Sequence, residues 1–309
     1  MTRHSERRFA VAAAVVTILA GLTPASAGGE KPAAAAGALP NPFYAYCVGI
    51  GVDKESGTLQ AQLRLPAILA ELGYSGMAFV GLEGAVEMLQ ALESRGLRLF
   101  AVYTPLNVDA GDPGYDPRLR ELIPKLQGHG TMVWLVVNSR EHKPSSTSAD
   151  ARAVALLREI ADQAEPFGVS ISLYPHRGAY AERMEDVVRL AQKAARKNVG
   201  VTFGLCHYLA VDEAKNLDRV LAMCRPHLTM VTINGTSGYD PKDRAAWIQT
   251  LDQGTFDVSR VLRTLRKLQY EGPIGIIAYG IKGDPRDILA RSMKAWRELA
   301  AKAVSSPAK

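Results

Sequence analysis

The sequence has little of what would define a disulfide-bonded, membrane-embedded or nucleic-acid-binding protein. Only three cysteines occur among its 309 residues, without C-x-x-C spacing, so we expect buried free thiols at Cys47, Cys206 and Cys224. The net charge of +6 is mild and the basic residues are scattered, which argues against a nucleic-acid partner. After residue 27, no apolar run is long enough to cross a membrane.

Residues 1–27 predict a secretory signal peptide. Three arginines within the first eight residues precede an apolar run, Phe9–Leu22, that is shorter than a membrane span. Ala25, Ser26 and Ala27 then form a cleavage site of the A-x-A type. An N-terminal membrane anchor is the alternative, which the short run and the small residues after it disfavour. We therefore expect an exported protein, periplasmic or secreted, whose mature chain begins near Gly28.

Composition divides the rest of the chain into one domain with two loose ends. Residues 28–42 are rich in alanine, glycine and proline and predict a flexible linker, because they cannot bury enough apolar surface to offset their ordering entropy. Residues 303–309 predict a disordered tail for the same reason. Between them, residues 43–302 are enough for a single domain with a full core.

Short apolar runs alternate with helical patterns throughout this domain. Each run is apolar on both faces, as strands covered by helices are, and several helical segments end at glycine or asparagine before the next run. Eight such units predict an α/β fold, a single (β/α)₈ TIM barrel. A doubly wound open sheet is the alternative, but residues 49–57 lack the helix start that a glycine-rich nucleotide loop requires. The eight runs begin at Tyr44, Gly76, Arg98, Thr131, Ser170, Val199, Leu228 and Pro273.

Two histidines follow neighbouring predicted strands. His176 closes the fifth strand and His207 the sixth, whereas His129 and His227 precede strands. Loops after the strands build the active face of such barrels, and loops before them hold the fold together. A single histidine is by default structural, but two at adjacent strand ends favour a functional site, so we predict His176 and His207 as catalytic residues.

Strand alternation adds further polar side chains to this predicted site. If His176 faces the lumen, Tyr174 faces it too, and Asn234 and Tyr279 end the seventh and eighth strands. Such a set is rich in hydrogen-bonding groups and poor in carboxylates. It suits binding and proton transfer on a polyhydroxylated ligand, with Tyr174 as a third catalytic residue and Asn234 and Tyr279 as substrate-binding residues.

The longest predicted loop, residues 235–257, offers further substrate contacts. Trp247 could stack on a sugar face and Asp243 could bind its hydroxyls, since loops of this length are often lids or binding loops. The alternative is a short surface helix whose Trp247 packs on the barrel rim. Lys282 precedes the last helix, where barrels often bind phosphate, although a plain helix start explains it better.

The chain resembles the xylose isomerase-like TIM barrels, also called sugar phosphate isomerases/epimerases. Residues 68–79 and 254–276 carry this resemblance, and the motifs YPH, FGLCH and TING, at residues 174–176, 203–207 and 232–235, resemble an exported subgroup. The resemblance implies a barrel that binds a divalent cation through carboxylates and a histidine. That metal polarises a sugar carbonyl and hydroxyl during isomerisation or epimerisation.

Most of the ligand positions that the resemblance implies have been replaced. The residues at the four carboxylate positions are Ala78, Tyr174, Gly204 and Ile277, and Asn234 stands at the seventh strand. His176 and His207 remain and could hold a divalent metal weakly, completed by a loop carboxylate such as Asp53, Glu83 or Asp243. The endonuclease members of this fold need many histidine and aspartate ligands, which are absent.

Together these features predict an exported isomerase, epimerase or lyase that transfers protons next to a sugar carbonyl. The alternative is a non-catalytic sugar-binding barrel that has lost its metal site, and a third is a barrel kept for protein contact. A small-molecule carbohydrate is the expected partner. Which sugar it is, whether a metal is bound and how many subunits assemble stay open, because this fold hosts many chemistries.

Overall fold

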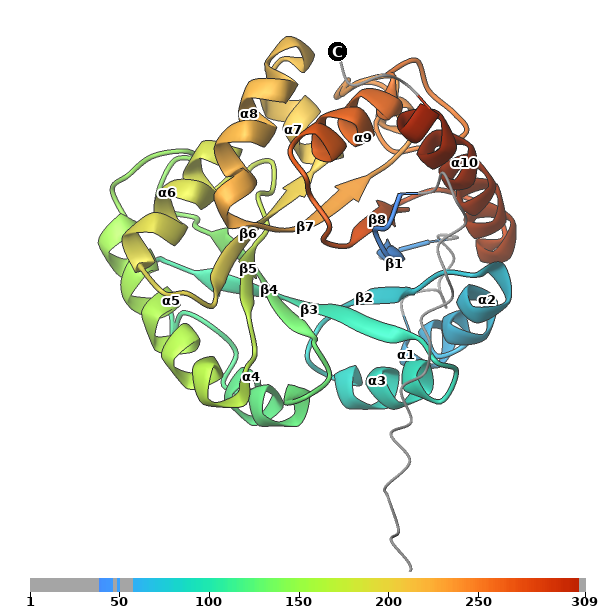
Figure 1. Cartoon of the computed structure of the whole chain (residues 1–309). Coiled ribbons are helices and arrows are strands. Elements are labelled where there is room, and N and C mark those ends of the chain that lie inside the picture. The colour runs from blue at the N-terminus through green and yellow to red at the C-terminus, as the bar shows by residue number, and fades with distance from the viewer. Residues whose placement is uncertain (1–38, 47–48, 51–57, 306–309) are drawn as a thin grey trace, which may run out of the picture. The chain divides into compact units, whose positions relative to one another are not determined.

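The strands form one closed parallel barrel. In the computed structural model, residues 39–46, 49–50 and 58–305 are described. Each strand pairs with the next along the chain, and β8 pairs with β1 (Figure 1). This confirms the predicted (β/α)₈ TIM barrel. The strands are β1 (Phe43–Tyr46), β2 (Gly76–Val80), β3 (Arg98–Asn107), β4 (Met132–Asn138), β5 (Ile171–Leu173), β6 (Val199–Gly204), β7 (Leu228–Ile233) and β8 (Ile274–Ile277).

Helices surround the barrel and cover the outward faces of its strands (Figure 1). Two expected glycines end helical segments in a left-handed conformation: Gly73 after α2 (φ 83°) and Gly168 after the 3₁₀ turn that continues α5 (φ 65°). The helices are α1 (Leu59–Gln62), α2 (Leu65–Leu72), α3 (Ala85–Glu93), α4 (Arg118–Leu122), α5 (Asp150–Ala164), α6 (Met184–Ala194), α7 (Leu205–Val211), α8 (Leu217–Cys224), α9 (Val258–Lys267) and α10 (Pro285–Ser305).

The apolar character of both strand faces follows from two separate cores. In β4, Val133, Leu135 and Val137 point outward into the core beneath the helices. Trp134 and Val136 alternate with them and point into the lumen. Because successive side chains of a strand point to opposite faces, one continuous apolar run fills both cores.

Aromatic rings fill the lumen. Tyr44 lies 5.2 Å from Phe100 and 6.2 Å from Trp134, measured between ring centroids, and its hydroxyl donates to the Val231 carbonyl. Gly275 pairs with Tyr44 in the neighbouring strand, and a Cβ there would lie 2.4 Å from the tyrosine ring. The lumen is therefore a packed core, as in other barrels of this kind.

Two domain boundaries differ from the sequence prediction. Asn41, assigned to the linker, is buried, and its Nδ2 donates to the carbonyl oxygens of Tyr270 (2.9 Å) and Gly272 (2.8 Å). At the other end, α10 continues to Ser305, and Ala303, assigned to the tail, is buried. Tertiary contacts offset the ordering entropy of these residues, which composition alone does not reveal.

Several predictions fall on residues that the structure does not describe. The signal peptide at 1–27, the linker as far as residue 38, Cys47 and residues 306–309 all lie outside the described residues. Cys206 and Cys224 are buried free thiols, as predicted. Among the helices that are described, none combines the length and the apolarity needed to span a bilayer.

A network of ion pairs joins α5 to α6 on the outside of the barrel. The buried Asp150 carboxylate accepts hydrogen bonds from Tyr180 Oη (2.7 Å), Arg189 Nε (3.0 Å) and Lys193 Nζ (2.7 Å). Arg189 Nη1 also lies 2.5 Å from Oδ1 of the buried Asp186. Burial by itself would raise the pKa of Asp150, but the bonds from Lys193, Arg189 and Tyr180 together lower it.

Candidate active site

A cavity of about 270 Å³ opens at the carboxyl end of the barrel. Aromatic, imidazole and guanidinium groups dominate its surface. Tyr46, Tyr103 and Tyr174 contribute rings from β1, β3 and the end of β5, with centroids 6.0–6.1 Å apart. Tyr174 packs edge-on against the other two rings, which are tilted by 37° relative to each other. The described lining residues are Tyr46, Val80, Tyr103, Tyr174, His176, Arg177, His207, Arg244, Trp247, Ile248, Ile277 and Tyr279.

The two predicted histidines meet in this cavity. The ring centroids of His176 and His207 lie 4.2 Å apart, with the ring planes inclined by 40°. His176 lies in the loop after β5. His207 lies in the first turn of α7, which begins directly after β6, whereas the sequence pattern had placed it in the strand. The helix turns the ring toward His176, so the predicted proximity is confirmed.

The backbone of one residue, Arg177, fixes the tautomers of both rings. The carbonyl oxygen of Arg177 lies 2.9 Å from His176 Nδ1, and since a carbonyl can only accept, His176 Nδ1 carries a proton. The backbone N–H of Arg177 donates to His207 Nδ1 at 3.3 Å, so that nitrogen is unprotonated. In their neutral forms, His176 therefore has a free lone pair on Nε2, and His207 has an N–H on Nε2.

The surroundings keep both rings neutral. Burial lowers the pKa of His176, which the hydrogen bond to the Arg177 carbonyl only partly offsets. For His207, only 4% exposed, burial and then the charges of His176 and Arg177 lower the pKa well below its usual value. A neutral acceptor beside a neutral donor is an arrangement that can move a proton onto and off a bound ligand.

Tyr174 fills the space that a carboxylate on β6 would need. A Cβ at Gly204 would lie 3.2 Å from Tyr174 Oη and 3.3 Å from Thr232 Oγ1. The Tyr174 hydroxyl is itself 3.5 Å from Thr232 Oγ1. Burial raises the pKa of Tyr174 well above its usual range, so its hydroxyl stays protonated and can act as a hydrogen-bond donor.

The residues of this cavity do not fit the metal site that the family resemblance implies. The phenol of Tyr174 occupies the region beside β5 and β6, and Ala78 and Ile277 supply no ligand atom. Of the loop carboxylates considered, Glu83 and Asp243 are exposed and outside the lining, and Asp53 lies outside the described residues. For this reason, no step of the proposed chemistry involves a metal.

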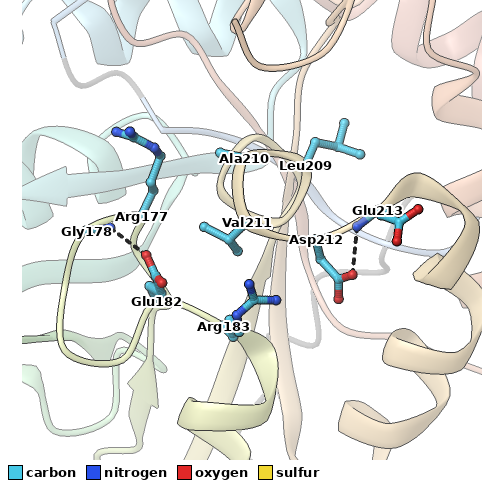
Figure 2. A pocket seen from close by; sticks show the side chains of 9 residues that line it. All are labelled: Arg177, Gly178, Glu182, Arg183, Leu209, Ala210, Val211, Asp212 and Glu213. Carbon is cyan, nitrogen blue, oxygen red and sulfur yellow. Dashed lines mark hydrogen bonds between the residues drawn. The ribbon is translucent and has the colours of Figure 1, made fainter. Parts of the chain in front are cut away.

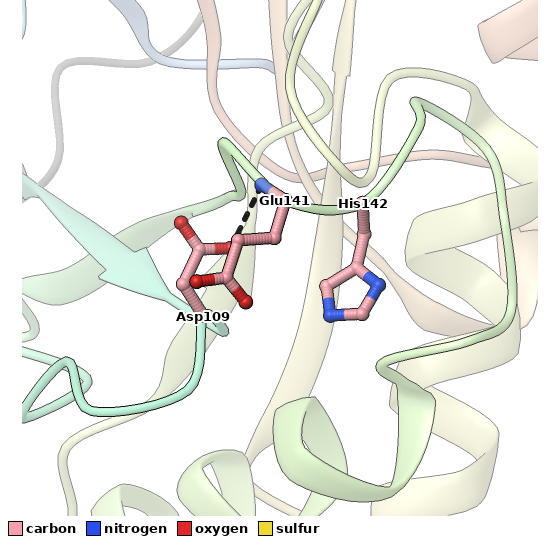
Figure 3. Close-up of side chains that lie close together, drawn as sticks. All are labelled: Asp109, Glu141 and His142. Carbon is pink, nitrogen blue, oxygen red and sulfur yellow. Dashed lines mark hydrogen bonds between the residues drawn. The ribbon is translucent and has the colours of Figure 1, made fainter.

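A separate group of residues whose side chains could bind a metal lies on the loops after β3 and β4. Ligand atoms of Asp109, Glu141 and His142 lie within 4.8 Å of one another, the only such group of three among the described residues (Figure 3). Asp109 Oδ1 accepts a hydrogen bond from Ser139 Oγ, and its Oδ2 accepts one from the backbone N–H of Arg140. Asp109 thus ties its neighbouring loop in place, and the group lies outside the cavity lining.

Trp247, from the long loop, packs on the barrel rim and also lines the cavity. Its Nε1 donates to the Cys206 carbonyl at 2.7 Å, and its ring packs edge-on against His207 and Tyr239 at 5.7 and 5.1 Å. The side chain is therefore packed on the rim and at the same time forms part of the cavity wall. The 3₁₀ turn Arg244–Ala246 precedes it, and the surface helix considered from the sequence does not form.

Three predicted substrate contacts lie elsewhere. Asn234 is fully buried, and its Nδ2 donates to the carbonyl oxygens of Gly235 (2.8 Å) and Trp247 (3.0 Å), so it anchors the long loop from within. Asp243 and Lys282 are exposed and outside the cavity lining. Alternation along β7 gave the face of Asn234 correctly but could not show that the returning loop would cover it.

The sequence reasoning missed two arginines and two tyrosines of the cavity. Arg177 directly follows His176, and Arg244 lies in the long loop. Tyr46 is the last residue of β1, and Tyr103 lies within β3. Their positions after or near strand ends were a usable signal. These four residues were not predicted, because the candidates were histidines and the residues at the implied ligand positions.

A parallel barrel with paired imidazoles at its carboxyl end defines the class of this protein as a TIM barrel with an enzyme-like cavity. Residues 66–299 match the family model described as xylose isomerase-like TIM barrel, and the chain belongs to this family. The resemblance found from the sequence is thereby confirmed. None of the curated proteins matches the chain.

Solved structures show the same fold at low identity. A probable 3-DHS dehydratase from Bacillus anthracis is 12% identical with a TM-score of 0.65, covering 82% of this chain and 97% of that one. D-Allulose 3-epimerase from Methylomonas sp. is 16% identical, with a TM-score of 0.64 and coverages of 84% and 98%. A 3-keto-D-glucoside 4-epimerase from E. coli is 18% identical, with a TM-score of 0.62 and coverages of 84% and 99%.

Proposed function

We propose that this protein is a carbohydrate-active isomerase, epimerase or lyase that transfers a proton next to a sugar carbonyl. The observation that carries the proposal is the pair of neutral imidazoles, with ring centroids 4.2 Å apart, whose opposite tautomers are set by the backbone N–H and carbonyl of Arg177. Support also comes from the structures of similar fold, which include two sugar epimerases and a dehydratase. A small-molecule carbohydrate is the proposed partner.

In this reaction His176 is the base and His207 the acid. His176 Nε2 takes the proton from the carbon next to the carbonyl, and His207 Nε2–H donates a proton to the carbonyl oxygen, which gives an enediol. Return of the first proton from His176 to the former carbonyl carbon, while the deprotonated His207 takes the proton of the other enediol hydroxyl, gives the isomer. In elimination, His176 instead gives its proton to the hydroxyl on the next carbon, which leaves as water while His207 regains its proton from the enediol. Because His176 alone removes and returns the carbon-bound proton, both events occur on one face of the ligand, which favours isomerisation or elimination over epimerisation.

The phenols of the cavity orient the ligand. The Tyr174 hydroxyl stays protonated and donates to a ligand oxygen, and Tyr279 is 49% exposed at the cavity mouth. Burial raises the pKa of Tyr103 to about 12, so this hydroxyl is also a donor and not a base. Trp247 offers an aromatic wall for a sugar face.

Deuterium exchange tests the proposal directly. The protein is incubated in D₂O with a panel of aldoses, ketoses, keto-glycosides and their acid and phosphate derivatives, and NMR follows the C–H bonds next to each carbonyl. We expect exchange with at least one substrate, and a loss of 10²- to 10⁴-fold in His176→Gln and in His207→Gln. His129→Gln is the matched control, because this histidine pairs with Glu93 and does not line the cavity.

Two outcomes contradict the proposal. One is unchanged exchange in both cavity variants. The other is a large loss of thermal stability in both variants with exchange retained, because the histidines would then be structural.

A non-catalytic sugar-binding barrel is the second candidate, favoured by the aromatic lining and by the replaced metal ligands. Calorimetry distinguishes the two candidates. Saturable binding of a sugar whose NMR spectrum stays unchanged after long incubation in D₂O indicates a binding protein. Turnover of the bound sugar excludes it.

We further propose that the protein is exported and that cleavage after Ala27 releases the mature chain. The basic start, the apolar run and the A-x-A site at Ala25–Ala27 support this proposal. Mass spectrometry of the protein from fractionated cells is expected to give an N-terminus at Gly28, outside the cytoplasmic fraction. A full-length cytoplasmic chain would exclude export.

A further inference from the structure

Every charged side chain on the described lining of the cavity is basic. Arg177 follows His176 after β5, and Arg244 begins the 3₁₀ turn in the loop after β7. The other described lining residues are histidine, tyrosine, tryptophan and aliphatic, with no aspartate or glutamate among them. Because both imidazoles are neutral, the two guanidinium groups supply the positive charge of the site.

Neither guanidinium forms an ion pair with a carboxylate of the described residues. In the described part of the chain, ten other arginines form ion pairs, but Arg177 and Arg244 form none. Arg177 is held in place by its contact with the Tyr239 ring, 4.4 Å from the centroid, and by its backbone bonds to both histidines. Its position is therefore fixed without any use of its guanidinium as an ion-pair donor.

Carboxylates near Arg177 belong to a neighbouring hollow of about 630 Å³, of which Arg177 forms one edge (Figure 2). There Glu182 accepts a hydrogen bond from the backbone N–H of Gly178 at 3.1 Å, and Asp212 accepts one from that of Glu213 at 2.7 Å. The Arg177 guanidinium extends away from the Glu182 carboxylate (Figure 2). Arginine and nearby carboxylates thus stay apart although ion pairing would be the default for exposed side chains.

We propose that the ligand of this cavity is an anionic sugar, a monosaccharide that carries a carboxylate or a phosphate group. Its anionic group binds Arg177 and Arg244, and its carbonyl end faces the two imidazoles. The planar fork of a guanidinium matches either anion with two parallel hydrogen bonds. A cavity of about 270 Å³ lies at the small end of ligand pockets, which fits one sugar unit and not an oligosaccharide. This inference rests on the proposed function for the placement of the carbonyl.

Calorimetry with matched probes tests the charge preference. D-Galacturonate and D-glucuronate are compared with D-galactose and D-glucose, and glucose 6-phosphate serves as the phosphate probe. We expect at least one acid to bind about 10- to 100-fold more tightly than its neutral counterpart, as charge-assisted hydrogen bonds predict, and less so at high salt. Tighter binding of the uronates assigns a carboxylate, and tighter binding of the phosphate probe assigns a phosphate.

Two variants locate the anion. Arg177→Met with Arg244→Met should abolish the preference for the acid. Arg183→Met is the matched control, since Arg183 lines only the neighbouring hollow, and it should leave the preference unchanged. The inference is overturned if neutral sugars bind as tightly as every acid, if the preference survives in the double variant, or if Arg183→Met removes it.

Failure here is distinguishable from failure of the proposed function. His176→Gln retains both arginines and is expected to bind acids with the same preference while losing deuterium exchange. Acid preference without any exchange in the unmodified protein would overturn the proposed function alone. Exchange on neutral sugars with no preference for acids would overturn this inference alone.

Discussion

Arginines in two regions of this molecule are used in opposite ways. Between α5 and α6, Arg189 bonds to Asp150 and Asp186, two buried carboxylates. At the carboxyl end of the barrel, Arg177 and Arg244 line a cavity whose described surface has no carboxylate. The first region satisfies its charges internally and stabilises the fold. The second leaves its charges for a ligand, as sites that bind anions do.

Breaking the paired region should have the largest effect. Asp150→Ala leaves Arg189 and Lys193 beside a buried space without their shared acceptor, and we expect a loss of about 3–5 kcal/mol in the free energy of unfolding. The melting temperature should fall by about 10 °C. Thermal and urea unfolding measure the change.

Asp162→Ala is the control for this prediction, because it removes a surface ion pair between Asp162 on α5 and Arg196, which lies just after α6. Its effect should be much smaller. Equal losses in the two variants would show that the α5–α6 network is an ordinary surface feature. Deuterium exchange by folded Asp150→Ala should remain unchanged, since the network does not line the cavity.

Beside the cavity, a substitution that crowds the contact between Gly204 and Tyr174 should give the next largest loss of stability. Gly204→Ala forces a Cβ to 3.2 Å from Tyr174 Oη, and we expect a loss of about 1–3 kcal/mol. Tyr174→Phe removes that oxygen, so the double variant should recover about 1 kcal/mol relative to additivity. Chemical denaturation of the four proteins completes the cycle. Strict additivity would mean that the phenol does not occupy this space.

Acid should weaken the cavity region before it affects the ion pairs. The pKa of His207 is lowered in the folded state, so below about pH 6.5 the unfolded chain binds a proton that the folded chain does not. Stability should therefore fall by about 1–2 kcal/mol between pH 7 and pH 5. Asp150, whose pKa is also lowered, loses its contribution only as the pH falls below about 4 and through its folded-state pKa.

His207→Gln tests the source of this pH dependence, and His129→Gln is its control. The first variant should flatten the stability profile between pH 7 and pH 5, and the second should not. The lowered pKa of His176 also keeps the base unprotonated, so exchange should persist below pH 6.5. A stability profile that is identical in all three proteins would contradict the neutral-imidazole assignment.

Neutralising the cavity arginines should have the smallest effect on stability. Arg177→Met with Arg244→Met removes exposed charges that have no carboxylate partner, so we expect a change within about 0.5 kcal/mol per site. Thermal unfolding measures it, and a gain is as compatible as a small loss. A decrease as large as that of Asp150→Ala would show that these arginines hold the fold together.

Sequence patterns predicted the barrel well because strand and helix periods are local. Each apolar run became a strand, and Gly73 and Gly168 end helical segments in a left-handed turn. The site was predicted in part. His176, His207, Tyr174, Tyr279 and Trp247 line the cavity, but Asn234, Asp243 and Lys282 do not. Asn234 was misplaced because its neighbours are set by a loop that returns thirteen residues later, at Trp247.

The sequence alone determined the eight units, their order and the ends of the strands at which chemistry could occur, since these follow from periodicity and from the direction of a parallel barrel. It also showed that carboxylates are missing at the positions where the family resemblance implies them. Only the tertiary structure decided that Arg177 lies between two imidazoles and fixes their protons, and that Tyr174 fills the space beside Gly204. Those contacts join different strands, and their geometry depends on how the barrel closes and how its loops return.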